Sequence, residues 1–82
     1  MSPPAKPFTY KKGQYLAFIY AYTRLHRRPP AETDMQRYLQ VSRPSVHQMV
    51  LALKREGLIT RQPGVARSIE MLVDPECLPV LR

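Results

Sequence analysis

Apolar residues recur at helical spacing through the first half of the chain and alternate with polar residues closer to its end. The first apolar face falls at i, i+3, i+4 and i+7, at Tyr15, Phe18, Ile19 and Tyr22. Thr9 offers a capping hydroxyl before this face, and the Pro29-Pro30 pair after it forces an extended connection. We therefore predict a helix from after Thr9 to near His26, with His26 capping its end.

A second, short helix is predicted at residues 32–40, with apolar positions at Met35, Tyr38 and Leu39. Acidic residues in its first turn, Glu32 and Asp34, suit the positive end of a helix dipole. The spacing of Thr33 and Gln36 matches a capping box, which would start the helix later.

The third helix carries the clearest local signals. Ser42 is the predicted N-cap, Pro44 suits the first turn, and Gly57 supplies a left-handed stop. The predicted buried stripe consists of Val46, Met49, Val50 and Leu53. Because little more than Gln40 and Val41 separates it from the second helix, the pair is predicted to form a helix-turn-helix.

Two strands follow, predicted at residues 58–61 and 68–73, with turn chemistry at Pro63-Gly64 between them. The predicted fold class is mainly α (α+β): a winged helix-turn-helix of three helices plus a C-terminal β-hairpin wing. We divide the chain into a mobile basic arm (1–7), the winged domain (8–73) and a C-terminal tail (74–82).

The net charge narrows the chemical class of the expected binding partner. The 82 residues carry a formal net charge of +7, and no acidic residue precedes Glu32. An anionic partner is therefore expected, although simple solubility would also explain the excess. A lone Cys77 rules out an intramolecular disulfide and a cysteine-based structural zinc site, and fits a cytoplasmic protein. No membrane span, leader segment or cofactor is predicted.

A recognition helix enters the major groove of DNA with its N-terminal residues leading. On the third helix, predicted from 42 to 56, the polar residues in that position are Ser42, Arg43, Ser45, His47 and Gln48. Gln48 could pair with adenine, and Arg43 with guanine or with a phosphate. The serines suit phosphate oxygens, together with free N–H groups at the helix start. A solvated helix face is the alternative interpretation.

The predicted wing, residues 61–68, is flanked by Arg61 and Arg67, which could reach backbone phosphates or the minor groove. Alternatively, Arg67 could do no more than pair with Glu70 across the hairpin.

These residues resemble the N-terminal DNA-binding domain of LexA repressors. The resemblance covers about residues 8–72: the Phe8-Thr9 start, Arg28-Pro29-Pro30 before the second helix, residues 53–59 (Leu-Lys-Arg-Glu-Gly-Leu-Ile) and the wing sequence from Pro63 to Leu72. It implies a winged helix that binds double-stranded DNA as a transcription regulator or repressor.

Three departures from the family pattern are visible. The turn before the third helix is about one residue shorter, the second helix lacks the usual threonine cap, and the chain ends where LexA would continue into its protease and dimerisation domain. Self-cleavage is therefore not expected, and because the recognition-helix residues differ, the operator sequence of LexA is not expected to carry over.

No arrangement of residues indicates an enzyme. The main alternative is a winged helix used for protein–protein contact, because Leu51 points away from the predicted core and the tail is apolar. A homodimer is left open, through Tyr20, through the tail, or on DNA alone.

Overall fold

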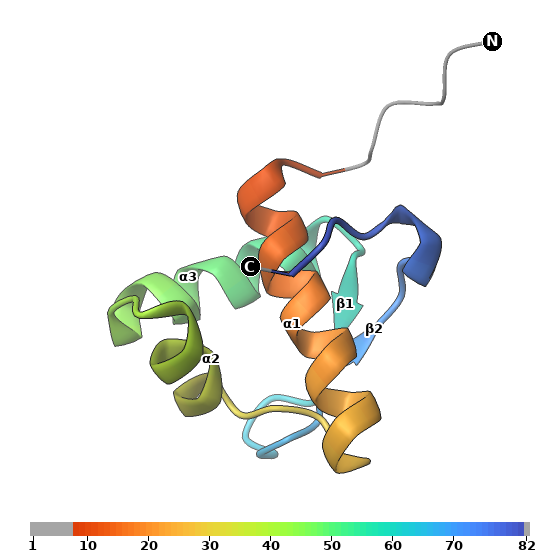
Figure 1. The fold of residues 1–82 in the computed structure, drawn as a ribbon. Coiled ribbons are helices and arrows are strands. Elements are labelled where there is room, and N and C mark those ends of the chain that lie inside the picture. Colours follow the sequence, from red (N-terminus) through yellow and green to blue (C-terminus); the bar gives the residue numbers. More distant parts are fainter. Residues whose placement is uncertain (1–7, 82) are drawn as a thin grey trace, which may run out of the picture.

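The computed structural model describes residues 8–81, and the predicted arm at 1–7 lies outside these described residues. Figure 1 shows three helices and a small hairpin: α1 (Tyr10–His26), α2 (Glu32–Leu39), α3 (Arg43–Arg55), β1 (Ile59–Thr60) and β2 (Glu70–Met71), followed by a 3₁₀ turn at Pro75–Cys77. The predicted winged helix-turn-helix fold is confirmed.

α1 begins where its capping residue predicts. The Thr9 hydroxyl accepts a hydrogen bond from the Lys12 N–H at 3.2 Å. At the other end Arg27 adopts a left-handed conformation (φ 58°) and its N–H donates to the Thr23 carbonyl. The predicted cap by His26 is wrong: its ring packs against Tyr22, with 4.2 Å between ring centroids.

α2 starts at Glu32, so the later start predicted from Thr33 and Gln36 is wrong. Asp34 supplies the cap instead, because its Oδ2 accepts a hydrogen bond from the Ala31 N–H at 2.8 Å. The helix ends at Leu39, and Gln40 takes the left-handed conformation (φ 54°) that turns the chain towards α3.

α3 and α1 supply most of the core. The predicted stripe of α3 is confirmed, with Val46, Val50 and Leu53 fully buried and Met49 partly buried. These side chains pack with apolar residues of α1, α2 and the hairpin, namely Tyr15, Leu16, Phe18, Ile19, Met35, Leu58, Ile59 and Ile69. This core fixes the side of α3 that remains in solvent.

The hairpin is shorter than predicted. Only Ile59 with Met71 and Thr60 with Glu70 form ladder pairs, because residues 61–69 make a loop with its own hydrogen bonds. The Ser68 hydroxyl accepts from the Gln62 N–H (2.9 Å) and donates to the Val65 carbonyl (2.9 Å), which replaces further ladder bonds. Below, "the wing" means β1, β2 and loop 61–69.

The predicted Pro63-Gly64 turn is confirmed at the tip of this loop. The Val65 N–H donates to the Gln62 carbonyl at 3.1 Å, and Gly64 has the positive φ (76°) that such a turn requires.

The tail packs on α1, across which it runs in Figure 1. Gln14 Nε2 donates to the Val80 carbonyl at 2.8 Å. A Cβ added to Gly13 would lie 3.0 Å from Phe8 and from Pro79, so glycine permits this close approach. Within residues 8–81, no helix is both long and apolar enough to cross a membrane.

Candidate nucleic-acid interface

The N-terminus of α3 is shaped by two serines and a proline. Ser42 Oγ accepts a hydrogen bond from the Ser45 N–H at 3.3 Å and donates one to Ser45 Oγ at 2.8 Å. Pro44 has no N–H to donate. Since two of the first three N–H positions are used or missing, any phosphate bound here would rely on hydroxyls and on Arg43 more than on free backbone donors.

The predicted contact flank of α3 is in solvent. Ser42, Arg43, Ser45, His47 and Gln48 are all exposed. Leu51, one turn further along α3, is 39% exposed and lies on the same helix outside the buried stripe. The tail, which packs on α1, does not cover this flank, so the side chains predicted to reach a major groove are accessible.

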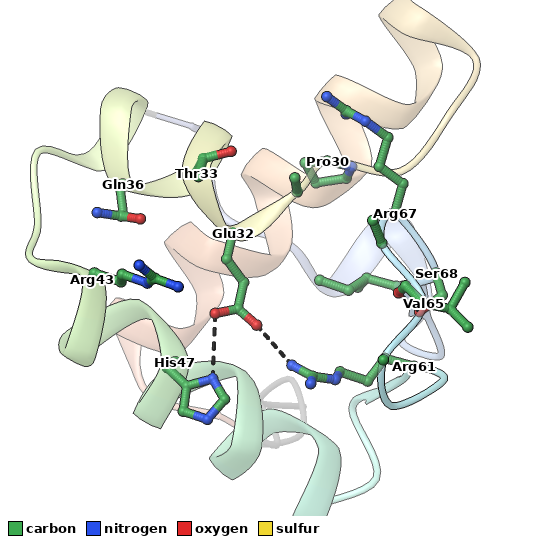
Figure 2. Close-up of a pocket in the computed structure, with 14 residues that line it drawn as sticks. Pro30, Glu32, Thr33, Gln36, Arg43, His47, Arg61, Val65, Arg67 and Ser68 are labelled. Atoms are coloured by element: carbon green, nitrogen blue, oxygen red, sulfur yellow. Dashed lines mark hydrogen bonds and ion pairs between the residues drawn. The ribbon is translucent and has the colours of Figure 1, made fainter.

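A groove of about 650 Å³ runs between the start of α2, the start of α3 and the wing (Figure 2). Its lining is mixed and includes Pro30, Ala31, Glu32, Thr33, Gln36, Arg43, His47, Arg61, Gly64, Val65, Ala66, Arg67, Ser68 and Ile69. Four predicted site residues therefore border one groove: Arg43, His47, Arg61 and Arg67. The structure places Ser42, Ser45 and Gln48 on α3 outside this lining.

Glu32 lies at the centre of the groove and bridges two of its walls (Figure 2). Its Oε2 accepts from Arg61 Nη1 of the wing at 2.7 Å, and its Oε1 lies 3.3 Å from His47 Nδ1 of α3. The Arg61 side chain is only 19% exposed in this arrangement. A single carboxylate of α2 thus contacts one side chain from each element predicted to contact DNA, His47 of α3 and Arg61 of the wing.

Arg67 points back into the protein. Its Nη1 donates to Asp34 Oδ2 (3.1 Å), Tyr22 Oη (3.1 Å) and the Pro29 carbonyl (3.2 Å). The alternative interpretation, in which Arg67 pairs only with Glu70, is therefore wrong. The partners come from α1, α2 and the connection between them, so Arg67 ties the loop of the wing to the helices.

Asp34 and Arg67, the two partners of this ion pair, both have shifted pKa values. Partial burial opposes ionisation of Asp34, but the hydrogen bond from Ala31 and the charge and hydrogen bond of Arg67 outweigh it and lower the pKa of Asp34. The hydrogen bond to Tyr22, together with the charge of Asp34, raises the pKa of Arg67. Both groups therefore stay ionised over a wide pH range.

Sequence reasoning placed Glu32 and Asp34 only as first-turn acids of α2. Their contacts with His47, Arg61 and Arg67 span 15 to 33 positions, so no local pattern predicts them. The available signal was that the first two acidic residues of a basic chain stand together at a helix start.

Residues 7–66 match the sequence profile described as "Iron dependent repressor, N-terminal DNA binding domain". The chain belongs to this family of DNA-binding domains. The family match covers α1, α2, α3, β1 and most of the loop of the wing, which includes the whole lining of the groove as far as Ala66.

The chain is also similar to LexA repressors. It is 31% identical to that of Thermosipho africanus over 75 residues, covering 92% of this chain and 38% of the relative. It is 30% identical to that of Thermosipho melanesiensis (89% and 37%) and 32% identical to that of Bartonella quintana (83% and 29%). The chain thus spans between 29% and 38% of the length of these relatives.

These matches bear out the predicted resemblance to LexA and the predicted DNA-binding class, because the family is one of DNA-binding domains and the relatives are named as repressors.

The name of the family refers to iron, and an iron site needs several donor side chains close together. Among residues 8–81, no three His, Cys, Asp or Glu side chains gather where they could hold a metal ion. Glu32 in the groove contacts His47 and Arg61, and Asp34, which does not line the groove, pairs with Arg67.

Proposed function

We propose that this chain is the DNA-binding domain of a transcriptional repressor that recognises a specific sequence in double-stranded DNA. The exposed flank of α3 enters the major groove, and the wing lies against the adjacent backbone or minor groove. Arg43, His47 and Gln48 face base edges or phosphates, while Ser42 and Ser45 face phosphates. The DNA backbone that separates the major groove from the minor groove then lies over the protein groove between α3 and the wing.

One observation carries this proposal: the polar flank of α3 is exposed beside a wing that brings Arg61 to the same groove, on a chain of net charge +7. The family to which the chain belongs supports the same conclusion, because it is a family of DNA-binding domains. The names of the LexA repressor relatives support a repressor rather than an activator.

The contacts of the two wing arginines favour different roles. Arg61 has a single carboxylate partner at the groove and can exchange it for a phosphate. Arg67 has three inward partners, so we assign it to positioning the wing. This assignment replaces direct DNA contact as the main role predicted for Arg67.

The salt dependence of binding tests the proposal. If the domain neutralises four or five phosphates, the logarithm of the binding constant falls with the logarithm of salt concentration with a slope of about −4. Arg43→Ala should weaken binding and reduce that slope by about one. Arg24→Ala is the matched control, because Arg24 is exposed on α1 and bonds to Tyr20 away from the groove. A flat salt titration with duplex DNA would contradict the proposal.

A protein-contact role is the second candidate, and one feature favours it. An apolar groove of about 570 Å³ lies on the opposite face of α2, lined by residues such as Phe18, Leu25, Tyr38 and Leu81. Leu25 is 78% exposed there. Loss of a partner protein on Leu25→Ser, with duplex binding unchanged, would assign this face to protein contact. A homodimer and a cytoplasmic location remain predictions.

A further inference from the structure

The centre of a surface proposed to bind a polyanion holds a carboxylate. Glu32 is 29% exposed at the side chain and lies where α2, α3 and the wing meet. Four basic side chains, Arg43, His47, Arg61 and Arg67, line the same groove, and Glu32 is the one acidic residue among its described lining. Such a residue opposes the general attraction between the groove and DNA.

Its opposition has two parts. The negative charge repels any phosphate that approaches within a few ångströms, whatever the base sequence. The carboxylate also holds Arg61 at 2.7 Å, so a phosphate must displace Glu32 before it can pair with Arg61. Since non-specific binding consists almost entirely of phosphate attraction, both effects weaken it directly.

Glu32 also contributes to order. Its second oxygen lies 3.3 Å from His47 Nδ1, on the exposed flank of α3, so the imidazole is oriented with Nε2 left for another partner. Orientation of this kind matters only where a side chain must meet one base edge, because a hydrogen bond to a base depends on geometry while phosphate attraction does not.

We propose that Glu32 is a specificity-determining residue of the duplex-binding surface, which weakens binding to arbitrary DNA and orients His47 and Arg61 for one sequence. The inference rests on the proposed function and adds to it a residue that reduces affinity in order to raise the specificity ratio.

Two substitutions separate charge from geometry. Glu32→Gln removes the charge and the ion pairs, so binding to a random-sequence duplex should tighten about fivefold and its salt slope should steepen by about one. Binding to a duplex selected by the wild-type chain should tighten less, so the ratio of the two affinities falls. Glu32→Asp keeps the charge but is too short to reach both partners. It should leave random-duplex binding within about twofold and weaken the selected duplex.

The matched control is Glu76→Gln, which removes the same charge from an exposed residue in the tail that does not line the groove. Both duplexes are titrated by fluorescence anisotropy at several salt concentrations, and circular dichroism verifies the fold of each variant.

The outcomes distinguish the two proposals. If the wild-type chain binds DNA with a steep salt slope but Glu32→Gln and Glu76→Gln behave alike on both duplexes, the role of Glu32 is overturned and the proposed function stands. If the wild-type chain binds neither duplex, or binds with no salt dependence, the proposed function fails.

Discussion

α3 and the wing border the same groove but are held in place by different interactions. α3 buries Val46, Val50 and Leu53 completely in the core. The wing has two ladder pairs, and its loop is joined to the helices by the buried Ile69 and the ion pairs of Arg61 and Arg67. Apolar burial changes little with salt, whereas part-exposed ion pairs weaken as salt is added. α3 is therefore the fixed element of the surface, and loop 61–69 of the wing is the adjustable one.

This contrast gives α2 a role beyond the helix-turn-helix. Its first turn carries both carboxylates, Glu32 and Asp34, that receive the arginines of the wing. Through these two pairs α2 holds loop 61–69 beside α3.

The largest effect is expected from breaking the packing of α3. Leu53→Ala removes a fully buried side chain and should lower the free energy of unfolding by about 2–5 kcal/mol, measured by urea denaturation. Leu51→Ala is the control on the same helix, since Leu51 is exposed, and should change stability by less than about 1 kcal/mol. Equal losses in the two variants would contradict the claim that burial fixes α3.

A smaller effect is expected from releasing the wing. Asp34→Ala removes the cap of α2 and the carboxylate partner of Arg67, and should cost about 1–2 kcal/mol. Amide hydrogen exchange should accelerate at residues 61–69 more than in α3. Glu70→Ala, which removes the partner that the alternative interpretation gave to Arg67, should have almost no effect. If Glu70→Ala had the larger effect and Asp34→Ala almost none, Glu70 of the hairpin would be the main partner of Arg67.

The features that were predicted correctly from the sequence are the local ones. The bounds of α1 and α3, the buried stripe and the Pro63-Gly64 turn depend on residues within a few positions of one another, and all were predicted. The start of α2 at Glu32 agrees with the predicted range 32–40, but its capping residue was missed because Asp34 lies inside the helix and accepts from an alanine N–H. The short ladder and the partners of Arg61 and Arg67 were missed because they depend on segments brought together only by the complete fold.

For the site, the sequence indicated which side chains of α3 would be exposed, and the structure agrees. Glu32 was not foreseen, because nothing near it in the sequence shows that α3 and the wing approach α2 from two sides.

A substitution at the N-cap of α3 tests whether the start of this helix is stabilised independently of the wing. Ser42→Ala removes the hydroxyl that accepts from the Ser45 N–H and should cost about 1 kcal/mol, with faster exchange in the first turn of α3 and no change in the wing. Ser45→Ala retains the cap and should cost less. If loop 61–69 loosened as much as the start of α3, the two elements would not be separately held.

The smallest effect is expected from acid. The pKa of Asp34 is lower in the folded protein than in the unfolded chain, so its contribution to stability is present above the unfolded pKa and is lost as pH falls through the folded pKa. Protection of residues 61–69 from exchange, relative to the intrinsic rate at each pH, should therefore fall below about pH 4, ahead of protection in α3. Asp34→Asn should remove this pH dependence, and a wild-type wing that stays protected to the same pH as α3 would argue against it.

The central claim is that α3 and the wing form one surface that binds duplex DNA, and an NMR titration with a duplex selected by the chain tests it most directly. We expect the largest amide shift changes at Ser42 to Gln48 and at residues 61–67, with α1 and the tail little changed. Changes confined to the region before Phe8, or centred on Leu25 and Tyr38, would contradict the claim.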